Sequence, residues 1–239
     1  MNHIIALSGG KDSTALALRL RELYPDRPYT YLCTPTGNEL PEMAEHWSAL
    51  SEMLESELTF VSDGKTLYGE CIRQRCLPSW RMRWCTRELK IRPFQTYLIM
   101  HSPAISYVGL RADEIDSRQG VDHAEVLGIE NQYPLADWGW GLNEVVNYLA
   151  CRGVTVPRRT DCAACPLQTL HEWWRLWHVY PDEYRKAELL EATIGHTFRS
   201  DGRDTWPASL DGLRHEFESG RKPKEAIRDS KRMCSWCAR

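Results

Sequence analysis

The sequence predicts an α/β protein with a doubly wound, mainly parallel sheet and a smaller C-terminal helical appendage that contains cysteines. Short β-prone runs alternate with segments of helical periodicity along the first 150 residues, the order typical of a parallel sheet covered by helices on both faces. A glycine-containing loop directly follows the first of these runs. The alternation fades near residue 150, so we predict two domains, 1–150 and 151–239.

The predicted elements follow from local patterns. Residues 4–7 form a β-prone run that stops at Ser8-Gly9-Gly10, and helical periodicity follows over 14–23 through Leu16 and Leu20. The next predicted strand covers 29–33, and the helix after it covers 41–54, with Pro41 in its first turn. The remaining predicted elements are strands over 58–61 and 105–110 and a helix over 92–100.

The C-terminal region begins with a Cys-rich loop and continues into a Trp-rich stretch over 171–191. Trp173, Trp174 and Trp177 recur there at helical spacing. This pattern favours packing in a core or a domain interface over a platform on which bases stack.

Composition and charge exclude several classes of protein. The 239 residues include 30 basic and 33 acidic side chains, for a net charge of −3, with 42% hydrophobic and 26% charged residues. Disordered, collagenous and membrane-embedded chains have other compositions. We find neither a signal-peptide pattern nor an apolar run of about 18 residues, and we expect a cytoplasmic protein with no membrane partner. In a reducing compartment, the nine cysteines are expected to be metal ligands, redox groups or buried apolar residues.

The hexapeptide Ser8-Gly9-Gly10-Lys11-Asp12-Ser13 lies between a predicted strand and a predicted helix. Glycines let backbone N–H groups approach an oxyanion, the helix N-terminus adds positive potential, and Lys11 adds a mobile cation. Asp12 stands where a Walker A loop has Ser or Thr, and the Gly-x-Gly-x-x-Gly pattern of dinucleotide-binding folds is missing. The hexapeptide therefore predicts a phosphate site of another kind.

This hexapeptide resembles the signature of the PP-loop ATP pyrophosphatases, the adenine nucleotide alpha hydrolase superfamily. Three later segments resemble the phosphoadenosine-phosphosulfate (PAPS) reductase branch: Thr36-Gly37-Asn38-Glu39-Leu40-Pro41-Glu42, Cys85-Thr86 with Lys90 and Pro93, and Gly109-x-Arg111-x-Asp113-Glu114 with Arg118. The segment 133–145, with Pro134-Leu135 and Trp138, resembles a fourth. Pro35 stands where the branch has an acidic residue.

The resemblance implies ATP with Mg²⁺ as cofactor and cleavage between the α- and β-phosphates. It implies that Ser8 to Ser13 contact the phosphates or their magnesium, and that Lys11, Asp12, Ser13 and Cys85 take part in catalysis. It places Thr36, Gly37, Lys90 and Gly109 beside the nucleotide. It also makes Lys90, Arg111 and Arg118 candidates for gripping polyphosphate or an acidic substrate, while Asp113 and Glu114 orient those arginines or hold magnesium.

Two Cys-x-x-Cys pairs, Cys162/Cys165 and Cys234/Cys237, suit a metal site of four thiolates. In PAPS-reductase-like proteins, a cysteine at the position of Cys85 joins the later pair in holding a cluster. One interpretation is a [4Fe–4S] cluster on Cys85, Cys162, Cys165 and one tail cysteine, which we favour. The other is Zn²⁺ on the two pairs, with Cys85 as a reactive thiol. Cys71 or Cys76 is an alternative to the tail ligand.

The function expected from the resemblance is adenylation of a substrate in sulfur transfer. We expect an adenine nucleotide, an acceptor that is a nucleic acid or a small molecule, and a sulfur donor as partners, and we leave a homodimer open. One alternative is a sulfonucleotide (APS/PAPS) reductase that uses a tail cysteine, although 233–237 does not match the tail motif of those reductases. A non-catalytic nucleotide-binding module is a further alternative.

Overall fold

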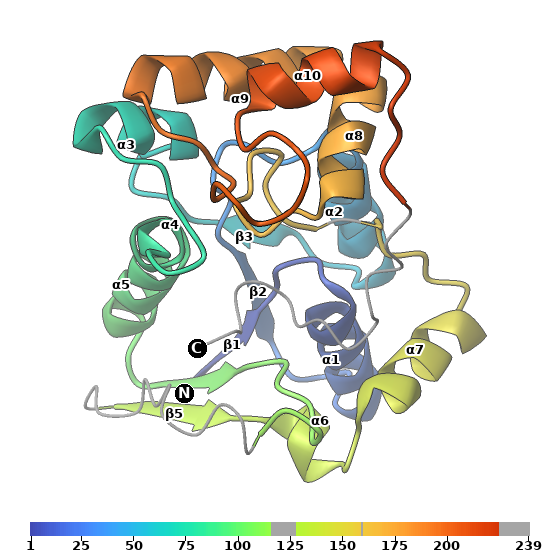
Figure 1. Cartoon of the computed structure of the whole chain (residues 1–239). Coiled ribbons are helices and arrows are strands. Elements are labelled where there is room, and N and C mark those ends of the chain that lie inside the picture. The colour runs from blue at the N-terminus through green and yellow to red at the C-terminus, as the bar shows by residue number, and fades with distance from the viewer. Residues whose placement is uncertain (116–127, 159, 225–239) are drawn as a thin grey trace.

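A parallel sheet of five strands forms the centre of the computed structural model (Figure 1), which describes residues 1–115, 128–158 and 160–224. The strands lie in the order β3-β2-β1-β4-β5. Their bounds are β1 Asn2–Ala6, β2 Tyr29–Cys33, β3 Leu58–Phe60, β4 Ala104–Tyr107 and β5 Ile129–Gln132. Every neighbouring pair is parallel, with Ile4 opposite Thr30 on one side of β1 and opposite Ser106 on the other.

Helices cover both faces of this sheet, because the strand residues are apolar on both. Ile5 and Leu7 pack in one core with residues of α1 (Lys11–Leu23), α2 (Pro41–Met53) and α7 (Leu142–Cys151). Ile4 and Ala6 point to the other face and pack against Phe94 of α5 (Arg92–Met100). The predicted doubly wound α/β fold is therefore confirmed.

The order of the strands identifies the position at which sheets of this type usually bind ligands. The chain moves outward from β1 to β2 and β3, then returns to the other side of β1 for β4 and β5. In such sheets, the crevice at the carboxyl ends of the strands, where the order reverses, is the usual ligand site. The loop that follows β1 lies at this position.

The remaining helices are α3 (Leu67–Gln74), α4 (Trp84–Thr86), a π-helical turn over Arg87–Ile91, α6 (Pro134–Asp137), α8 (Leu170–Val179), α9 (Pro181–Ile194) and α10 (Leu210–Glu218). In Figure 1, α8, α9 and α10 lie together at the top, beside α3. Trp173 is fully buried against Tyr184 and Phe198, while Trp174 and Trp177 are partly buried on the same core. The predicted packing role of this aromatic band is confirmed.

The observed bounds differ from the prediction in places with a physical cause. The first helix begins at Lys11 instead of 14, because Gly10 already serves as its N-cap. β4 covers Ala104–Tyr107, shorter than 105–110, because the chain at Gly109 turns against the backbone of Asp12 and Ser13. The second helix ends at Met53 and β3 at Phe60, one residue earlier than predicted in each case.

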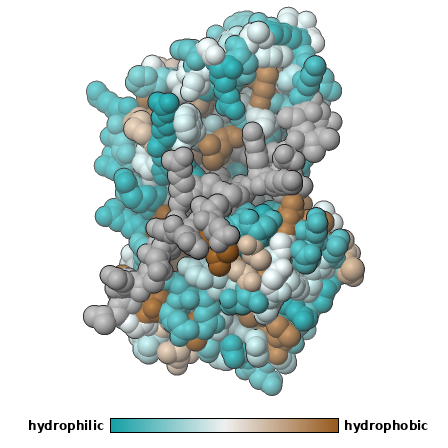
Figure 2. Space-filling model, turned by 60° about the horizontal axis from the view of Figure 1, so that its bottom comes forward, coloured by the Kyte–Doolittle hydropathy of each residue, from teal (hydrophilic) through white to brown (hydrophobic). Residues whose placement is uncertain are grey.

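The surface is mainly polar on the face shown in Figure 2, where apolar residues form separate small patches. Among the residues that the structure describes, no helix combines the length and the apolar character needed to cross a membrane.

Candidate functional site

The loop after β1 takes a conformation that its residues dictate. Gly9 has φ +80°, and a Cβ there would lie 2.8 Å from Met43 Cε and 2.9 Å from Trp47 Nε1, so glycine is required. The Ser8 and Ser13 hydroxyls lie 3.0 Å apart, and the Ser13 hydroxyl donates to Gly10 O at 3.1 Å. No side chain caps α1 at Gly10. The loop therefore points the N-terminus of α1 at the crevice, as an anion site requires.

Arg111 binds this loop through the carboxylate of Asp12. Its guanidinium is buried and donates from Nη1 to both Asp12 oxygens at 3.0 Å and from Nε to Asp113 Oδ1 at 2.9 Å, while Nη2 lies 2.7 Å from Glu114 Oε1. Burial alone would lower the pKa of Arg111, but the three carboxylates outweigh it and raise that pKa. At Asp113 the signs are reversed: burial would raise the pKa, but the hydrogen bond and the positive charge of Arg111 outweigh burial and lower it.

Gly109 brings the segment after β4 onto the loop. A Cβ at this position would lie 3.1 Å from both the carbonyl carbon of Asp12 and the amide nitrogen of Ser13. Only a glycine lets the two backbones approach this closely. The structure thus brings Gly109, Arg111, Asp113 and Glu114 together with the Ser8–Ser13 loop, and Arg111 contacts carboxylates there. Arg118 lies outside the described residues.

A second group of predicted residues lies at the carboxyl end of β2. The Thr36 N–H and hydroxyl both lie 2.6 Å from Glu39 Oε1, to which they donate, and the hydroxyl oxygen lies 3.1 Å from Cys162 Sγ. Gly37 has φ +72°, and a Cβ there would lie 2.8 Å from Thr66 Cγ2. The turn after β2 therefore depends on glycine and contacts the Cys-x-x-Cys loop directly.

Asn38 anchors that cysteine loop. Its side-chain oxygen accepts from Ala164 N at 3.0 Å, and its carbonyl accepts from Ala163 N at 2.7 Å. The bond to Ala164 is buried, and the two bonds fix the backbone between Cys162 and Cys165 beside the turn that follows β2. The C-terminal region thus contributes to the site that the first 150 residues build.

A small cavity joins the two groups. Its wall includes Ser8 of the phosphate loop, Thr34 and Glu39 after β2, and Lys90 of the π-helical turn. Trp47 closes one side, and no hydrogen-bond partner of its indole Nε1 is found among the described residues. Its volume of about 20 Å³ has room for little more than one water molecule, so the cavity shows which side chains lie beside the loop and is not itself a nucleotide pocket.

The thiols near Lys90 lie in a desolvated environment. Burial raises the pKa of Cys85 and raises that of Cys162 to about 11, although the charge of Lys90 opposes the shift at both. Burial also raises the pKa of Cys71, to about 12. These thiols are therefore protonated at neutral pH unless a metal or a substrate alters their environment.

The predicted metal ligands are only partly in view. Cys234 and Cys237 lie outside the described residues, and no group of three or more His, Cys, Asp or Glu side chains in the described ranges is arranged to hold a metal ion. Cys162 and Cys165 share one loop, and Cys85 and Cys162 pack against the same core, which includes Cys71. Which four thiols share a metal stays a prediction.

Three residues of the site were not predicted. His46 Nε2 donates to Gly9 O at 2.9 Å, and burial lowers the pKa of His46, which keeps the ring neutral. Trp47 and Thr160 line the cavity. His46 and Trp47 are ordinary helix residues by their pattern, and only the packing of α2 against the loop reveals their role. Glu39 was part of a family motif, which was the available signal.

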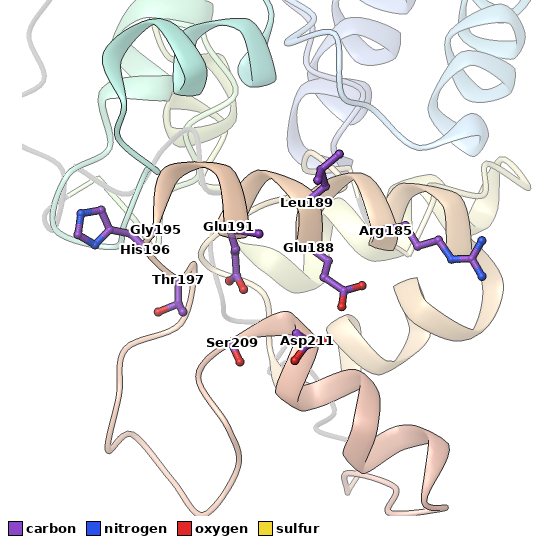
Figure 3. Close-up of a pocket in the computed structure, with 10 residues that line it drawn as sticks. Arg185, Glu188, Leu189, Glu191, Gly195, His196, Thr197, Ser209 and Asp211 are labelled. Atoms are coloured by element: carbon purple, nitrogen blue, oxygen red, sulfur yellow. The ribbon is translucent and has the colours of Figure 1, made fainter.

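A larger cavity, of about 470 Å³, lies between α9 and the segment that leads into α10. In Figure 3, Glu191 and Glu188 point from α9 toward the segment of Ser209 and Asp211. The Glu191 oxygens accept from Phe198 N at 2.8 Å and from Leu210 N at 2.6 Å. None of the described residues predicted for the site lines this cavity. The buried carboxylate of Glu191 accepts hydrogen bonds from backbone N–H groups, which is a structural role.

Comparison with known proteins agrees with the motifs. Residues 2–158 match the family model described as phosphoadenosine phosphosulfate reductase domain. A solved structure with a similar fold is phosphoadenylyl-sulfate (PAPS) reductase from Candida auris in a phosphate complex. It has 15% sequence identity and a TM-score of 0.49, over 65% of this chain and 75% of that chain. A search of curated proteins found no match.

Proposed function

Since the chain belongs to the phosphoadenosine phosphosulfate reductase domain family, we propose that it is an ATP-pyrophosphatase-type enzyme of that family, which adenylates a substrate for sulfur transfer. The observation that carries this proposal is the intact Ser8–Ser13 loop: α1 begins at Lys11 with no side chain capping its N-terminus, and Ser8 lines the cavity. A leaving pyrophosphate carries high negative charge, and such a loop stabilises it.

The residues divide the work as follows. The N–H groups of the loop and Lys11 bind the phosphates, and Lys11 Nζ lies 3.1 Å from Asp12 Oδ2. Arg111 keeps Asp12 in place, and His46 keeps Gly9 in place. Lys90 and Trp47 line the cavity beside the loop. Because Arg111 engages the carboxylates nearest the loop, Mg²⁺ fits as an ion held mainly by the phosphates themselves, whose charge it neutralises.

The experiment that tests this proposal is a product analysis with ATP and Mg²⁺. We expect pyrophosphate and an adenylated product or AMP, lost in Lys11→Ala. Lys65→Ala is the matched control, because Lys65 pairs with Asp63 away from the cavity. Release of ADP and phosphate, or the absence of nucleotide binding, would contradict adenylation.

Reduction of a sulfonucleotide is a second candidate, favoured by the thiols of Cys85 and Cys162 beside Lys90. It predicts sulfite release from APS or PAPS with a dithiol donor, and Cys234→Ser should abolish this release if the tail cysteine is the nucleophile. Sulfite release without ATP cleavage would replace the first proposal with the second.

The cofactor that we propose for the thiols is a [4Fe–4S] cluster, with Zn²⁺ as the alternative. Cys85, Cys162 and Cys165 are soft donors of the type that such a cluster takes. Among the described residues, no three His, Cys, Asp or Glu side chains are grouped so that they could hold a metal. Such a cluster would supply electron transfer or a site that binds sulfur. Anaerobic purification followed by iron, zinc and sulfide analysis distinguishes the two, since a cluster requires about four irons per chain.

A further inference from the structure

One segment of this chain has a charge opposite to that of the whole. Between residues 73 and 92 there are seven basic side chains against one acidic side chain, Glu88, whereas the chain as a whole has a net charge of −3. The basic residues are Arg73, Arg75, Arg81, Arg83, Arg87, Lys90 and Arg92. Such a concentration attracts a polyanion.

The segment presents exposed apolar side chains at a built turn. The Ser79 N–H donates to Met82 O at 3.1 Å, and the Met82 N–H donates to Ser79 Oγ at 3.0 Å, so Trp80 and Arg81 form the tip. Trp80 is 54% exposed and Met82 is 56% exposed. Leu77 and Trp84, on either side of the turn, are buried in the core. Trp80 and Met82 thus expose two large apolar side chains at one turn, whose flanking residues are anchored in the core.

The charges at the tip are available to a ligand. Arg73 pairs with Glu70, and Arg87 and Arg92 share Glu88. Within the described ranges, Arg75 and Arg81 form no ion pair, and both are exposed. The Arg81 guanidinium carbon lies 4.9 Å from the centre of the Trp80 ring, so the tip combines a cation with an aromatic face.

The segment also leads into the candidate site. From the tip, the chain continues through Cys85 to Lys90, and Lys90 lines the cavity together with Ser8 of the phosphate loop. The tip is thus ten residues along the chain, from Trp80 to Lys90, from a side chain of the cavity.

From these observations we infer that the exposed segment 75–82, with Arg75, Trp80, Arg81 and Met82, docks a single-stranded nucleic acid, which is the acceptor of the reaction. Trp80 stacks on a base, and the two arginines contact the flanking phosphates. Stacking distinguishes this partner from an acidic protein, because every base has an aromatic face that stacks on an indole and a carboxylate has none. The inference rests on the proposed function for the role of the strand as acceptor, but not for its binding.

The test measures binding of a fluorescent single-stranded 12-mer by anisotropy at several salt concentrations. We expect Trp80→Ala to weaken binding about tenfold or more, and Trp80→Phe to keep most of it, since Phe still stacks. We expect Arg75→Ala with Arg81→Ala to reduce the slope of log affinity against log salt by roughly 1.4, at about 0.7 for each phosphate that an arginine no longer neutralises. Far-UV circular dichroism verifies that each variant is folded.

The matched control is Tyr24→Ala. Tyr24 is 44% exposed and has Arg27 stacked over it at 4.3 Å, as Trp80 has Arg81. It lies at the C-terminal end of α1, hence at the opposite end of the sheet from the phosphate loop. This variant should bind the oligonucleotide like the wild type.

Two results would overturn the inference: unchanged affinity in Trp80→Ala, or competition by polyglutamate as effective as that by unlabelled oligonucleotide. The proposed function fails separately. If no pyrophosphate is released but Trp80-dependent binding persists, the docking surface stands and adenylation does not.

Discussion

Arg111 links the phosphate loop to the sheet. Its buried guanidinium contacts the carboxylates of Asp12, Asp113 and Glu114 at once. Removal of one partner from a buried ion pair leaves the other charges without compensation. Arg111, which the family resemblance makes a candidate for binding polyphosphate, therefore also stabilises the fold by compensating buried carboxylates.

We predict that Arg111→Met lowers the free energy of unfolding by about 3–5 kcal/mol, measured by urea denaturation. Arg19→Met is the control, since Arg19 pairs with Glu22 at the surface, and its cost should stay below about 1 kcal/mol. Equal stability of Arg111→Met and the wild type would show that the network contributes nothing.

Gly109 permits contact between two backbones, and its replacement should affect binding more than folding. In Gly109→Ala, the new methyl group meets the Asp12 and Ser13 backbone at 3.1 Å, and the loop must shift. We predict a loss of about 1–3 kcal/mol in stability and weaker ATP binding by calorimetry. Gly64→Ala provides the comparison for binding: no atom lies within 4 Å of a Cβ there. Its φ of +80° makes alanine cost stability as well, yet this variant should leave ATP affinity unchanged.

At the scale of elements, α9 depends on one carboxylate. Glu191 is buried and joins α9 to Phe198 and Leu210, which flank the loop before α10. Arg199 in the same loop donates to Pro207 O and to Asp204. The loop is thus held by buried polar groups on both of its sides.

Burial raises the pKa of Glu191 from 4.5 to about 7. Between these two values the folded protein keeps a proton that the unfolded chain releases, so the free energy of unfolding falls as pH rises through this window. We predict a loss of up to about 3 kcal/mol from this group between pH 4.5 and pH 7. Thermal unfolding across that range measures it.

Glu191→Gln is the control for this prediction, since glutamine does not titrate. The difference in stability between the variant and the wild type should change with pH only inside this window. A difference that is constant from pH 4.5 to pH 7 would assign the pH dependence to other groups.

At the scale of the whole molecule, the two predicted domains share a core. Leu40, Leu67 and Leu77 lie in one buried cluster with Trp173 and Tyr184. The division into two domains at residue 150 stays a prediction. This cluster contains residues from both sides of that position.

A chain that ends at residue 150 should therefore expose that cluster and lose the Cys162 loop that Asn38 anchors. We predict that it unfolds at a lower temperature and is digested faster by a protease than the full chain. A truncated chain that unfolds cooperatively at the temperature of the full chain would show that residues 1–150 fold independently.

The sequence predicted the central strands, and it missed β5 and α3. β1 and β2 are apolar on both faces, which is typical of buried parallel strands. β5 consists of Ile-Glu-Asn-Gln at the edge of the sheet, where no apolar run is needed. α3 contains Gly69, and Thr66 caps it by accepting from the Gly69 N–H, so its stability comes from packing that short-range patterns do not report.

By itself, the sequence determined the α/β fold and the position of the Ser8–Ser13 loop between the first strand and the first helix, because both follow from residues close together in the chain. The tertiary structure alone decided that Arg111 grips Asp12 across 99 positions, and that Thr36 contacts Cys162 across 126. It also decided that His46 and Trp47 face the loop. The physical reason is that hydrogen bonds and burial between distant residues depend on how the helices pack on the sheet, and no local pattern records that packing.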